Sequence, residues 1–199
     1  MSNFKSDELK KIRDEIWDLK ESPLYSYRTE NKFCPVIGEG SHDAEIMFIG
    51  EAPGATEAKT GRPFCGAAGK LLDELLISAG IKREDVYITN IVKDRPPENR
   101  DPLPEEIAFY GPFLERQINI IQPKAIATLG RFSMRFVMEK FGLIDLIKSI
   151  SQIHGKIFEA QVPYGKVKII TMYHPAAGIY HGEVKKALFE DFKILKSPL

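Results

Sequence analysis

Residues 45–76, EIMFIGEAPGATEAKTGRPFCGAAGKLLDELL, join an apolar run to a leucine-rich run through a loop rich in glycine and proline. The run at residues 45–50 has few polar interruptions, which is typical of a strand covered on both faces. The leucines of LLDELL (71–76) recur at helical spacing, and Gly80 ends that pattern. A strand, a glycine-rich turn and a helix in this order indicate a parallel α/β sheet.

The rest of the chain continues the alternation of strands and helices. Three more apolar runs predict strands, at residues 85–90, 123–130 and 166–175. Amphipathic patterns predict further helices, at residues 6–22, from 104 to about 118, from 131 onward and at 184–195. Residues 156–172 predict a hairpin with PYGK (163–166) as its turn, and residues 22–41 read as irregular. We therefore expect a parallel sheet wrapped by helices.

Length and composition fit one ordered globular domain. The 199 residues are 43% apolar, and we expect a single domain over residues 1–199, with residues 1–43 packing on it. Lysine plus arginine and aspartate plus glutamate both number 28, so phosphate contacts would have to come from local patches. Cys34 and Cys65 are too few for a disulfide scaffold, which favours a reducing compartment. Without an evident signal peptide or membrane span, the sequence predicts a cytoplasmic protein.

The four predicted strands end in GEAPG, TN, LG and YHP. In open α/β sheets, ligands bind at the carboxyl ends of the strands. The glycine-rich loop, Asn90 and His174 should therefore face one crevice, although they lie far apart in the sequence.

The glycine-rich loop is open to two interpretations. It is not a P-loop, because no Gly-Lys-Ser/Thr follows it, and it lacks Gly-x-Gly-x-x-Gly. It could be only a tight turn, or its backbone N–H groups and the helix starting near Ala67 could approach an anion. Phe64, commonly a core residue, follows Pro63 in this loop, where an aromatic ring held over a cleft suits stacking on a flat ligand.

Asn90 and His174 also have structural and functional readings. Asn90 could be only a turn residue, but its carboxamide can pair with O4 and N3–H of uracil, whereas cytosine presents the opposite pattern. His174 could be a core histidine, or could donate a hydrogen bond to an oxygen that gains negative charge. His42, His154 and His181 have no metal-ligand spacing, and we assign them no role.

The stretch KDRPPENRDP (93–102) carries Lys93, Arg95 and Arg100 between prolines. It could be a solvated loop, or a phosphate-binding loop at the mouth of the crevice that contacts DNA through these three side chains.

Taken together, these motifs resemble the uracil-DNA glycosylases, family 4 in particular. The matching stretches are GEAPGATEAKTGRPFCGAAGKLLDELL, ITNIVKDRPPENRDPLPEEI, FLERQI and YHPAA, and the likeness runs from Ala44 to Phe192. It implies a three-layer α/β/α sandwich with a central four-stranded parallel sheet. It also implies base-excision repair, in which the N-glycosidic bond of uracil in DNA is hydrolysed to free uracil and an abasic site.

The resemblance assigns roles to individual residues. It makes Phe64 the ring that stacks on a flipped uracil, Asn90 the reader of the polar edge of the base, and His174 the donor to O2. Glu51 becomes the nearest candidate to orient the attacking water, since Ala52 stands where some relatives place an aspartate. The resemblance also implies that the base and sugar are contacted by Gly50, Glu51, Ala52 and Pro53, and that Glu57 lies at the 5-position of the base. Ile179 or Tyr180 would fill the gap left by the flipped nucleotide.

Two features depart from relatives in this family. Many members hold an iron–sulfur cluster on four cysteines, which a chain with two cysteines cannot supply, so we expect no cofactor and no metal. Asp94 and Tyr110 stand where two of the ligands are expected, and residues 22–25 lie near the place of the N-terminal pair. No KRRIH-like insertion follows the second motif, which implies ordinary turnover and not covalent trapping of DNA.

Two alternatives remain open from the sequence. The chain could be a non-catalytic module that binds uracil or damaged DNA, although Phe64, Asn90 and His174 argue against this. It could also be an unrelated nucleotide-binding α/β hydrolase. For the enzyme we expect a monomer that acts on uracil-containing DNA, single- or double-stranded, and not at a membrane.

Overall fold

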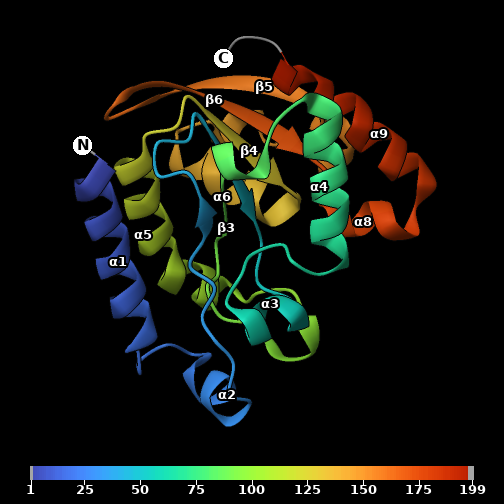
Figure 1. Ribbon diagram of the computed structural model, residues 1–199. Helices are drawn as coiled ribbons and strands as arrows, with labels where there is room; N and C mark the ends of the chain where they lie inside the picture. The colour runs from blue at the N-terminus through green and yellow to red at the C-terminus, as the bar shows by residue number, and fades with distance from the viewer. Residues whose placement is uncertain (1, 197–199) are drawn as a thin grey trace.

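A computed structural model of the protein describes residues 2–196, which form a six-stranded sheet with helices on both faces (Figure 1). The strands are β1 (Glu39–Gly40), β2 (Ile46–Gly50), β3 (Tyr87–Asn90), β4 (Ala125–Leu129), β5 (Lys156–Val162) and β6 (Gly165–Met172). Their order is β1-β3-β2-β4-β6-β5. The four central strands are parallel, as expected, and β1 and β5 add antiparallel edges.

The register of the sheet brings the carboxyl ends of the central strands together. Gly50 at the end of β2 pairs with Asn90 at the end of β3, and Leu129 of β4 pairs with Met172 of β6. Every residue of β2, β3 and β4 is buried, as the apolar runs predicted for strands covered on both faces. The loops after these strands therefore share one edge of the sheet.

Helices cover the two faces of the sheet. The helices of residues 2–196 are α1 (Ser2–Trp17), α2 (Tyr25–Glu30), α3 (Ala55–Thr60), α4 (Ala67–Ala79), α5 (Pro104–Ile121), α6 (Arg131–Lys140), α7 (Ile150–Ile153), α8 (Pro175–Tyr180) and α9 (Gly182–Phe192), of which α2 and α3 lie beyond the edge of the sheet (Figure 1). Short 3₁₀ turns lie at Arg83–Asp85, Pro97–Asn99, Ile144–Leu146 and Lys193–Lys196. Helices α1 and α5 run side by side on one flank, and α4, α8 and α9 group on the other (Figure 1).

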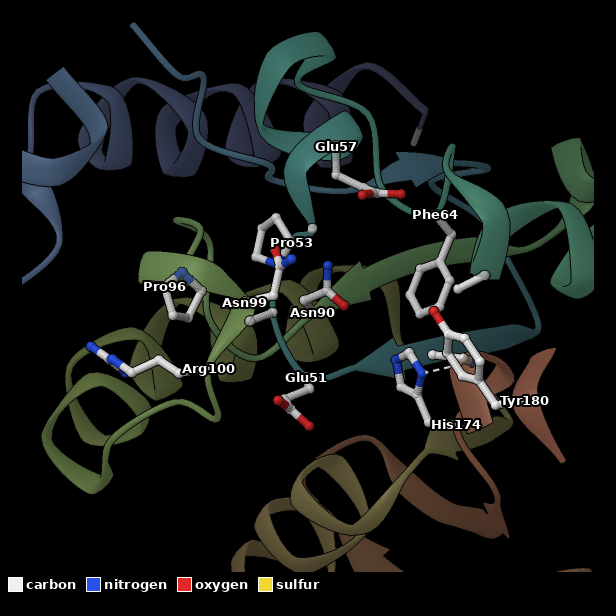
Figure 2. Close-up of a pocket in the computed structure, with 14 residues that line it drawn as sticks. Glu51, Pro53, Glu57, Phe64, Asn90, Pro96, Asn99, Arg100, His174 and Tyr180 are labelled. Atoms are coloured by element: carbon white, nitrogen blue, oxygen red, sulfur yellow. Dashed lines mark hydrogen bonds between the residues drawn. The ribbon is translucent and has the colours of Figure 1, made fainter. Parts of the chain in front are cut away.

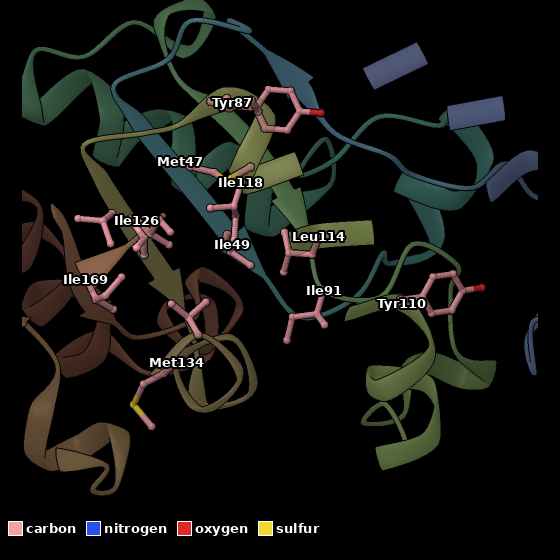
Figure 3. Packing of buried hydrophobic residues seen from close by; sticks show 14 of the residues in the cluster. Met47, Ile49, Tyr87, Ile91, Tyr110, Leu114, Ile118, Ile126, Met134 and Ile169 are labelled. Atoms are coloured by element: carbon pink, nitrogen blue, oxygen red, sulfur yellow. The ribbon is translucent and has the colours of Figure 1, made fainter. Parts of the chain in front are cut away.

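The sheet separates two hydrophobic cores. Successive side chains of a strand point to opposite faces, so Met47 and Ile49 enter one core and Phe48 enters the other. The first core packs β-strand residues against α1, α5 and α6, with Leu114 and Ile118 at its centre (Figure 3). The second core packs the other face against α4 and α9, and is formed around Phe48, Leu72, Leu75, Leu188 and Phe192.

Short elements differ from the sequence prediction. Residues 22–41, predicted as irregular, contain α2 and β1, and the loop after β2 contains α3. These segments are too short for a hydrophobic period to show, so the surrounding contacts decide their conformation. The predicted hairpin is confirmed, with Val162 opposite Gly165 across its turn. Within residues 2–196, no helix combines the length and the apolar character needed to cross a bilayer.

Candidate active site

A cavity of about 480 Å³ opens at the carboxyl edge of the sheet, between the loops that follow β2, β3 and β6 (Figure 2). It is lined by Glu51, Ala52, Pro53, Gly54, Glu57, Phe64, Ala68, Asn90, Pro96, Asn99, Arg100, His174, Ala176 and Tyr180. The predicted crevice is thus present, and it brings together Phe64 from the loop after β2, Asn90 from the end of β3 and His174 from the start of α8.

Phe64 is held rigidly at the wall of this cavity. Its backbone adopts a left-handed conformation, with φ of 47°, which is strained for a residue with a side chain. Gly69 permits the turn, because a Cβ there would lie 1.9 Å from the Phe64 carbonyl oxygen. Arg83 donates to the Pro63 carbonyl at 2.7 Å and fixes the loop from outside. The Phe64 ring lies 5.6 Å from the His174 ring between centroids, at an angle of 30°.

Glu57 fastens the Phe64 loop from inside the cavity. This α3 side chain is largely buried, and its Oε1 accepts from the N–H of Cys65 at 2.9 Å and of Gly66 at 2.7 Å. Gly66 is the N-cap of α4. The carboxylate that meets the start of α4 therefore belongs to the protein, and the sequence had suggested a ligand anion there. Figure 2 shows Glu57 at the side of the cavity opposite Glu51.

Asn90 presents an unsatisfied polar atom to the cavity. The side chain is 2% exposed, and among residues 2–196 its Oδ1 is buried without a hydrogen-bond partner. Gly50 makes room for it, since a Cβ at Gly50 would lie 2.3 Å from Asn90 Oδ1 and 2.7 Å from Phe64 Cζ. A buried acceptor without a partner destabilises a protein unless a ligand supplies the missing donor. The geometry at Asn90 thus fits a ligand that carries an N–H group.

His174 is a neutral hydrogen-bond donor. It is the N-cap of α8, where its Nδ1 accepts from the N–H of Ala176 at 3.1 Å. With Nδ1 occupied as an acceptor, the proton of the neutral ring must be on Nε2. Burial lowers the pKa of His174 to about 4, and the charge of Glu57 acts in the opposite direction. The ring therefore stays neutral at pH 7 and can donate from Nε2.

Glu51 lies on the His174 side of the cavity, away from Glu57 (Figure 2). Burial and the negative charge of Asp101 raise the pKa of Glu51 to about 7, while Arg131 acts in the opposite direction. A carboxyl group with a pKa near neutrality is suited to accept a proton from water. The structure places no other acidic side chain except Glu57 in the lining of the described cavity.

Lys93 does not lie at the mouth of the crevice, and its predicted contact with DNA is wrong. The side chain is fully buried, and Nζ donates to Asn90 O at 2.6 Å, Gln117 Oε1 at 2.6 Å and Thr89 Oγ1 at 2.8 Å. Three oxygens match the three donors of an ammonium group, although burial lowers the pKa of Lys93. Lys93 thus braces the strand end that carries Asn90.

The two arginines of the same loop lie nearer the surface. Arg100 lines the cavity and forms a bidentate pair with Glu106, with N–O distances of 2.9 and 2.6 Å. Arg95 is half-buried, donates to Asn99 Oδ1 at 2.8 Å and lies over the Phe33 ring. Arg100 thus reaches the cavity, and Arg95 contacts its wall through Asn99.

The end of α8 carries the two residues expected to enter DNA. Tyr180 is 81% exposed and lines the rim of the cavity, whereas Ile179 is 42% exposed and lies outside the lining. Exposure of two large apolar side chains beside a cavity is consistent with a surface that meets a partner.

Several lining residues escaped the sequence analysis. They are Gly54, Ala68, Pro96, Asn99 and Ala176. Asn99 has a φ of 55° in a short 3₁₀ turn, and its sequence context, PPEN, indicated only a turn. Gly54, Ala68 and Ala176 line the cavity through the path of the backbone, and no pattern in the sequence predicts that path.

Comparison with known proteins identifies the family of the chain. Residues 37–193 match the family model of the uracil DNA glycosylase superfamily. The chain is 45% identical to a type-4 uracil-DNA glycosylase of Sulfurisphaera tokodaii over 96% of this chain and 84% of the relative. It is 46% identical to that of Archaeoglobus fulgidus (94% and 91% covered), and 43% identical to that of Saccharolobus solfataricus (97% and 87%). The chain belongs to the uracil-DNA glycosylase superfamily.

Proposed function

We propose that this enzyme is a family 4 uracil-DNA glycosylase, which hydrolyses the bond between uracil and deoxyribose and leaves free uracil and an abasic site. Type-4 relatives with more than 40% identity over most of the chain support this activity. One observation carries the proposal at the level of the site. Asn90, whose buried Oδ1 has no hydrogen-bond partner among residues 2–196, lines the same cavity as Phe64 and His174.

Asn90 selects uracil by its pattern of donors and acceptors. Its Oδ1 accepts from N3–H of uracil, and its Nδ2 donates to O4. Cytosine presents an acceptor at N3 and a donor at position 4, so the same amide orientation meets two mismatches. Phe64 stacks on the face of the base, and Gly50, which has no side chain, lets the Asn90 amide and the Phe64 ring occupy the positions that contact the base. Glu57, in our proposal, also excludes the 5-methyl group of thymine.

His174 stabilises the leaving group. When the N-glycosidic bond breaks, its electron pair passes to the uracil ring and the sugar becomes oxocarbenium-like. The Nε2–H of His174 donates to O2, where negative charge accumulates. Water then adds to C1′ of the sugar and releases one proton, which Glu51 accepts, and the departing uracil anion gains a proton from solvent.

The DNA lies across the rim of the cavity. We propose that Ile179 or Tyr180 fills the gap left by the flipped nucleotide, and that Arg95 and Arg100 contact phosphates. We propose that the enzyme acts as a monomer. The substrate is uracil-containing DNA, single- or double-stranded, so the enzyme acts inside the cell.

A single-turnover cleavage assay tests the proposal. The substrate is a labelled oligonucleotide with one uracil, and alkali reveals abasic sites; thymine and hypoxanthine oligonucleotides serve as controls. We expect His174→Ala to slow cleavage by about 10²–10³-fold, as for loss of one oxyanion donor, with nearly unchanged DNA affinity. His181→Ala, the same change beyond the other end of α8, should leave the rate unchanged.

Other outcomes would favour the alternatives. Binding of the uracil oligonucleotide without cleavage, by folded protein, would favour a non-catalytic binding module. Tight binding of free nucleotides regardless of the base would favour a nucleotide-binding hydrolase.

A further inference from the structure

Four polar side chains meet in the interior behind the loop that follows β3. They are Ser22, Arg28, Asp94 and Tyr110, here called the Asp94 cluster, and each is at most 6% exposed. Arg28 Nη1 lies 3.3 and 3.2 Å from the two Asp94 carboxylate oxygens. Tyr110 donates to Asp94 Oδ2 at 2.6 Å. Charged side chains are rarely buried this fully unless a specific partner compensates for the loss of water.

The polar atoms of the Asp94 cluster satisfy one another's hydrogen-bonding capacity. Because the Tyr110 proton goes to Asp94, the Ser22 hydroxyl donates to the Tyr110 oxygen, and it accepts from the N–H of Leu24 at 3.1 Å. Burial raises the pKa of Asp94, and the hydrogen bond from Tyr110 and the charge of Arg28 oppose this rise. The cluster is thus a closed network with no unpaired charge among these four side chains.

The network joins distant parts of the chain. Arg28 of α2 also donates to the carbonyls of Ile16 at 3.0 Å and Trp17 at 2.8 Å, at the end of α1. Tyr110 belongs to α5. Asp94 belongs to the loop after β3, which also supplies Pro96, Asn99 and Arg100 to the cavity. The cluster therefore connects the N-terminal helices directly to one wall of the pocket.

These residues do not fit an iron–sulfur cluster. By the resemblance to family 4, relatives that bind the cluster carry cysteines at the positions of Asp94 and Tyr110 and near Ser22. The thiolates of such cysteines are the ligands of the iron atoms. Here a guanidinium, a phenol and a hydroxyl occupy the space around one carboxylate. A cationic side chain beside the donors opposes the binding of a metal cation. Within residues 2–196, no grouping of histidine, cysteine or acidic side chains could hold a metal ion.

We propose that the Asp94 cluster is a metal-free positioning device, which holds residues 94–100 against the N-terminal helices and thereby sets one wall of the uracil pocket. The proposal rests on the proposed function, since that wall belongs to the uracil site. It predicts that the effects of substituting Arg28 and Asp94 are coupled, and so are not additive. Removing Arg28 alone leaves Asp94 buried and unpaired, whereas removing the charges of both partners relieves the imbalance.

Three variants and a matched control test the coupling. Arg28→Met and Asp94→Asn each remove one charge, and the double variant removes both, while the amide oxygen introduced at position 94 still accepts from Tyr110. The control is Arg116→Gln, which breaks an exposed ion pair with Glu15 that also joins α1 and α5. The readouts are amide hydrogen exchange of residues 94–100, and KM against single-turnover rate on uracil DNA.

We expect Arg28→Met to speed exchange in residues 94–100 and to raise KM, each by about tenfold, with a single-turnover rate within about threefold of wild type. The rate is retained because His174, Phe64 and Asn90 lie on other segments. The double variant should lie closer to wild type than Arg28→Met does. Arg116→Gln should leave both the exchange and KM unchanged.

Several results would overturn the proposal. Equal effects of Arg28→Met and Arg116→Gln would show that the cluster contributes only to packing. The same conclusion would follow if Arg28→Met lowered the stability of the fold but left exchange and KM unchanged. If Arg28→Met fails to fold, Tyr110→Phe serves as the milder variant, and unchanged exchange there counts against the cluster. About four iron atoms in each purified wild-type chain would also refute it. An inactive wild type would overturn the function alone, because the exchange readout needs no activity.

Discussion

Glu51 gives the site a pH dependence that can be predicted at the residue scale. Its pKa, raised to about 7 by burial and by Asp101, means that the proton-accepting form is lost as the pH falls below about 7. We therefore expect the single-turnover rate to fall as the pH drops below about 7, which gives the pH–rate profile an acidic limb. Glu51→Gln should be slower and should lack this limb, and Asp101→Asn should move the limb to lower pH. Rate measurements from pH 5 to 9 check this, to within about one pH unit.

The assignment to Glu51 has two internal checks. His174 cannot cause the same limb, because its pKa lies near 4. The folded protein holds the Glu51 proton between the ordinary pKa of 4.5 and about 7, where the unfolded chain has lost it. This group therefore lowers stability as the pH rises through that window, and Glu51→Gln should remove that slope. A limb near pH 7 that persists in Glu51→Gln would belong to another group.

Gly50 is the residue at which the smallest change should close the pocket. In Gly50→Ala, the new methyl group would lie 2.3 Å from Asn90 Oδ1 and 2.7 Å from Phe64 Cζ, so both groups must move. A displacement of about 1 Å can lower a rate about 100-fold, and we expect at least that loss in cleavage. Gly182→Ala is the matched control, since within residues 2–196 no atom outside its own helix backbone and its chain neighbours lies within 4 Å of the new methyl. Normal cleavage by folded Gly50→Ala would contradict the pocket geometry.

At the scale of elements, Glu57 connects α3 to the start of α4. Glu57→Ala removes the acceptor shared by the N–H groups of Cys65 and Gly66 and should lower the free energy of unfolding by about 1–3 kcal/mol. It should also weaken uracil binding, because the Phe64 loop loses its inner support. Glu57→Gln keeps an oxygen at the same place and should show a smaller effect. Urea unfolding measures the stability and KM reports the weaker binding of uracil DNA. Identical changes in Glu57→Ala and Glu57→Gln would show that the oxygen acceptor at this position does not support the loop.

Lys93 braces the end of β3 from inside the fold. Lys93→Met leaves the three oxygens that it contacts without this donor, and should lower the free energy of unfolding by about 1–3 kcal/mol. The salt dependence of DNA binding should not change, because a buried group contacts no phosphate. Loss of a phosphate contact would reduce the slope of log K against log salt by about one, the change expected for Arg100→Gln. A reduced slope in Lys93→Met would restore the sequence-based assignment.

At the scale of the whole molecule, the sequence predicted what depends on local pattern and on sheet topology. Buried strands carry apolar runs, and parallel strands bring their ends together, so the meeting of Phe64, Asn90 and His174 could be anticipated. The interior position of Lys93 depends on Gln117, which comes from a different element. The same holds for Arg28, whose burial depends on Asp94. Pairings across elements leave no periodic signal in a single sequence.

The separation of the two cores by the sheet has a mechanical consequence. Phe64 packs in the core of α4 and α9, whereas Tyr110, which holds Asp94, packs in the core of α1 and α5. The two sides of the pocket are therefore anchored in different hydrophobic cores, on opposite faces of the sheet. We therefore expect that a local opening of one wall, without the other, is enough to admit a base.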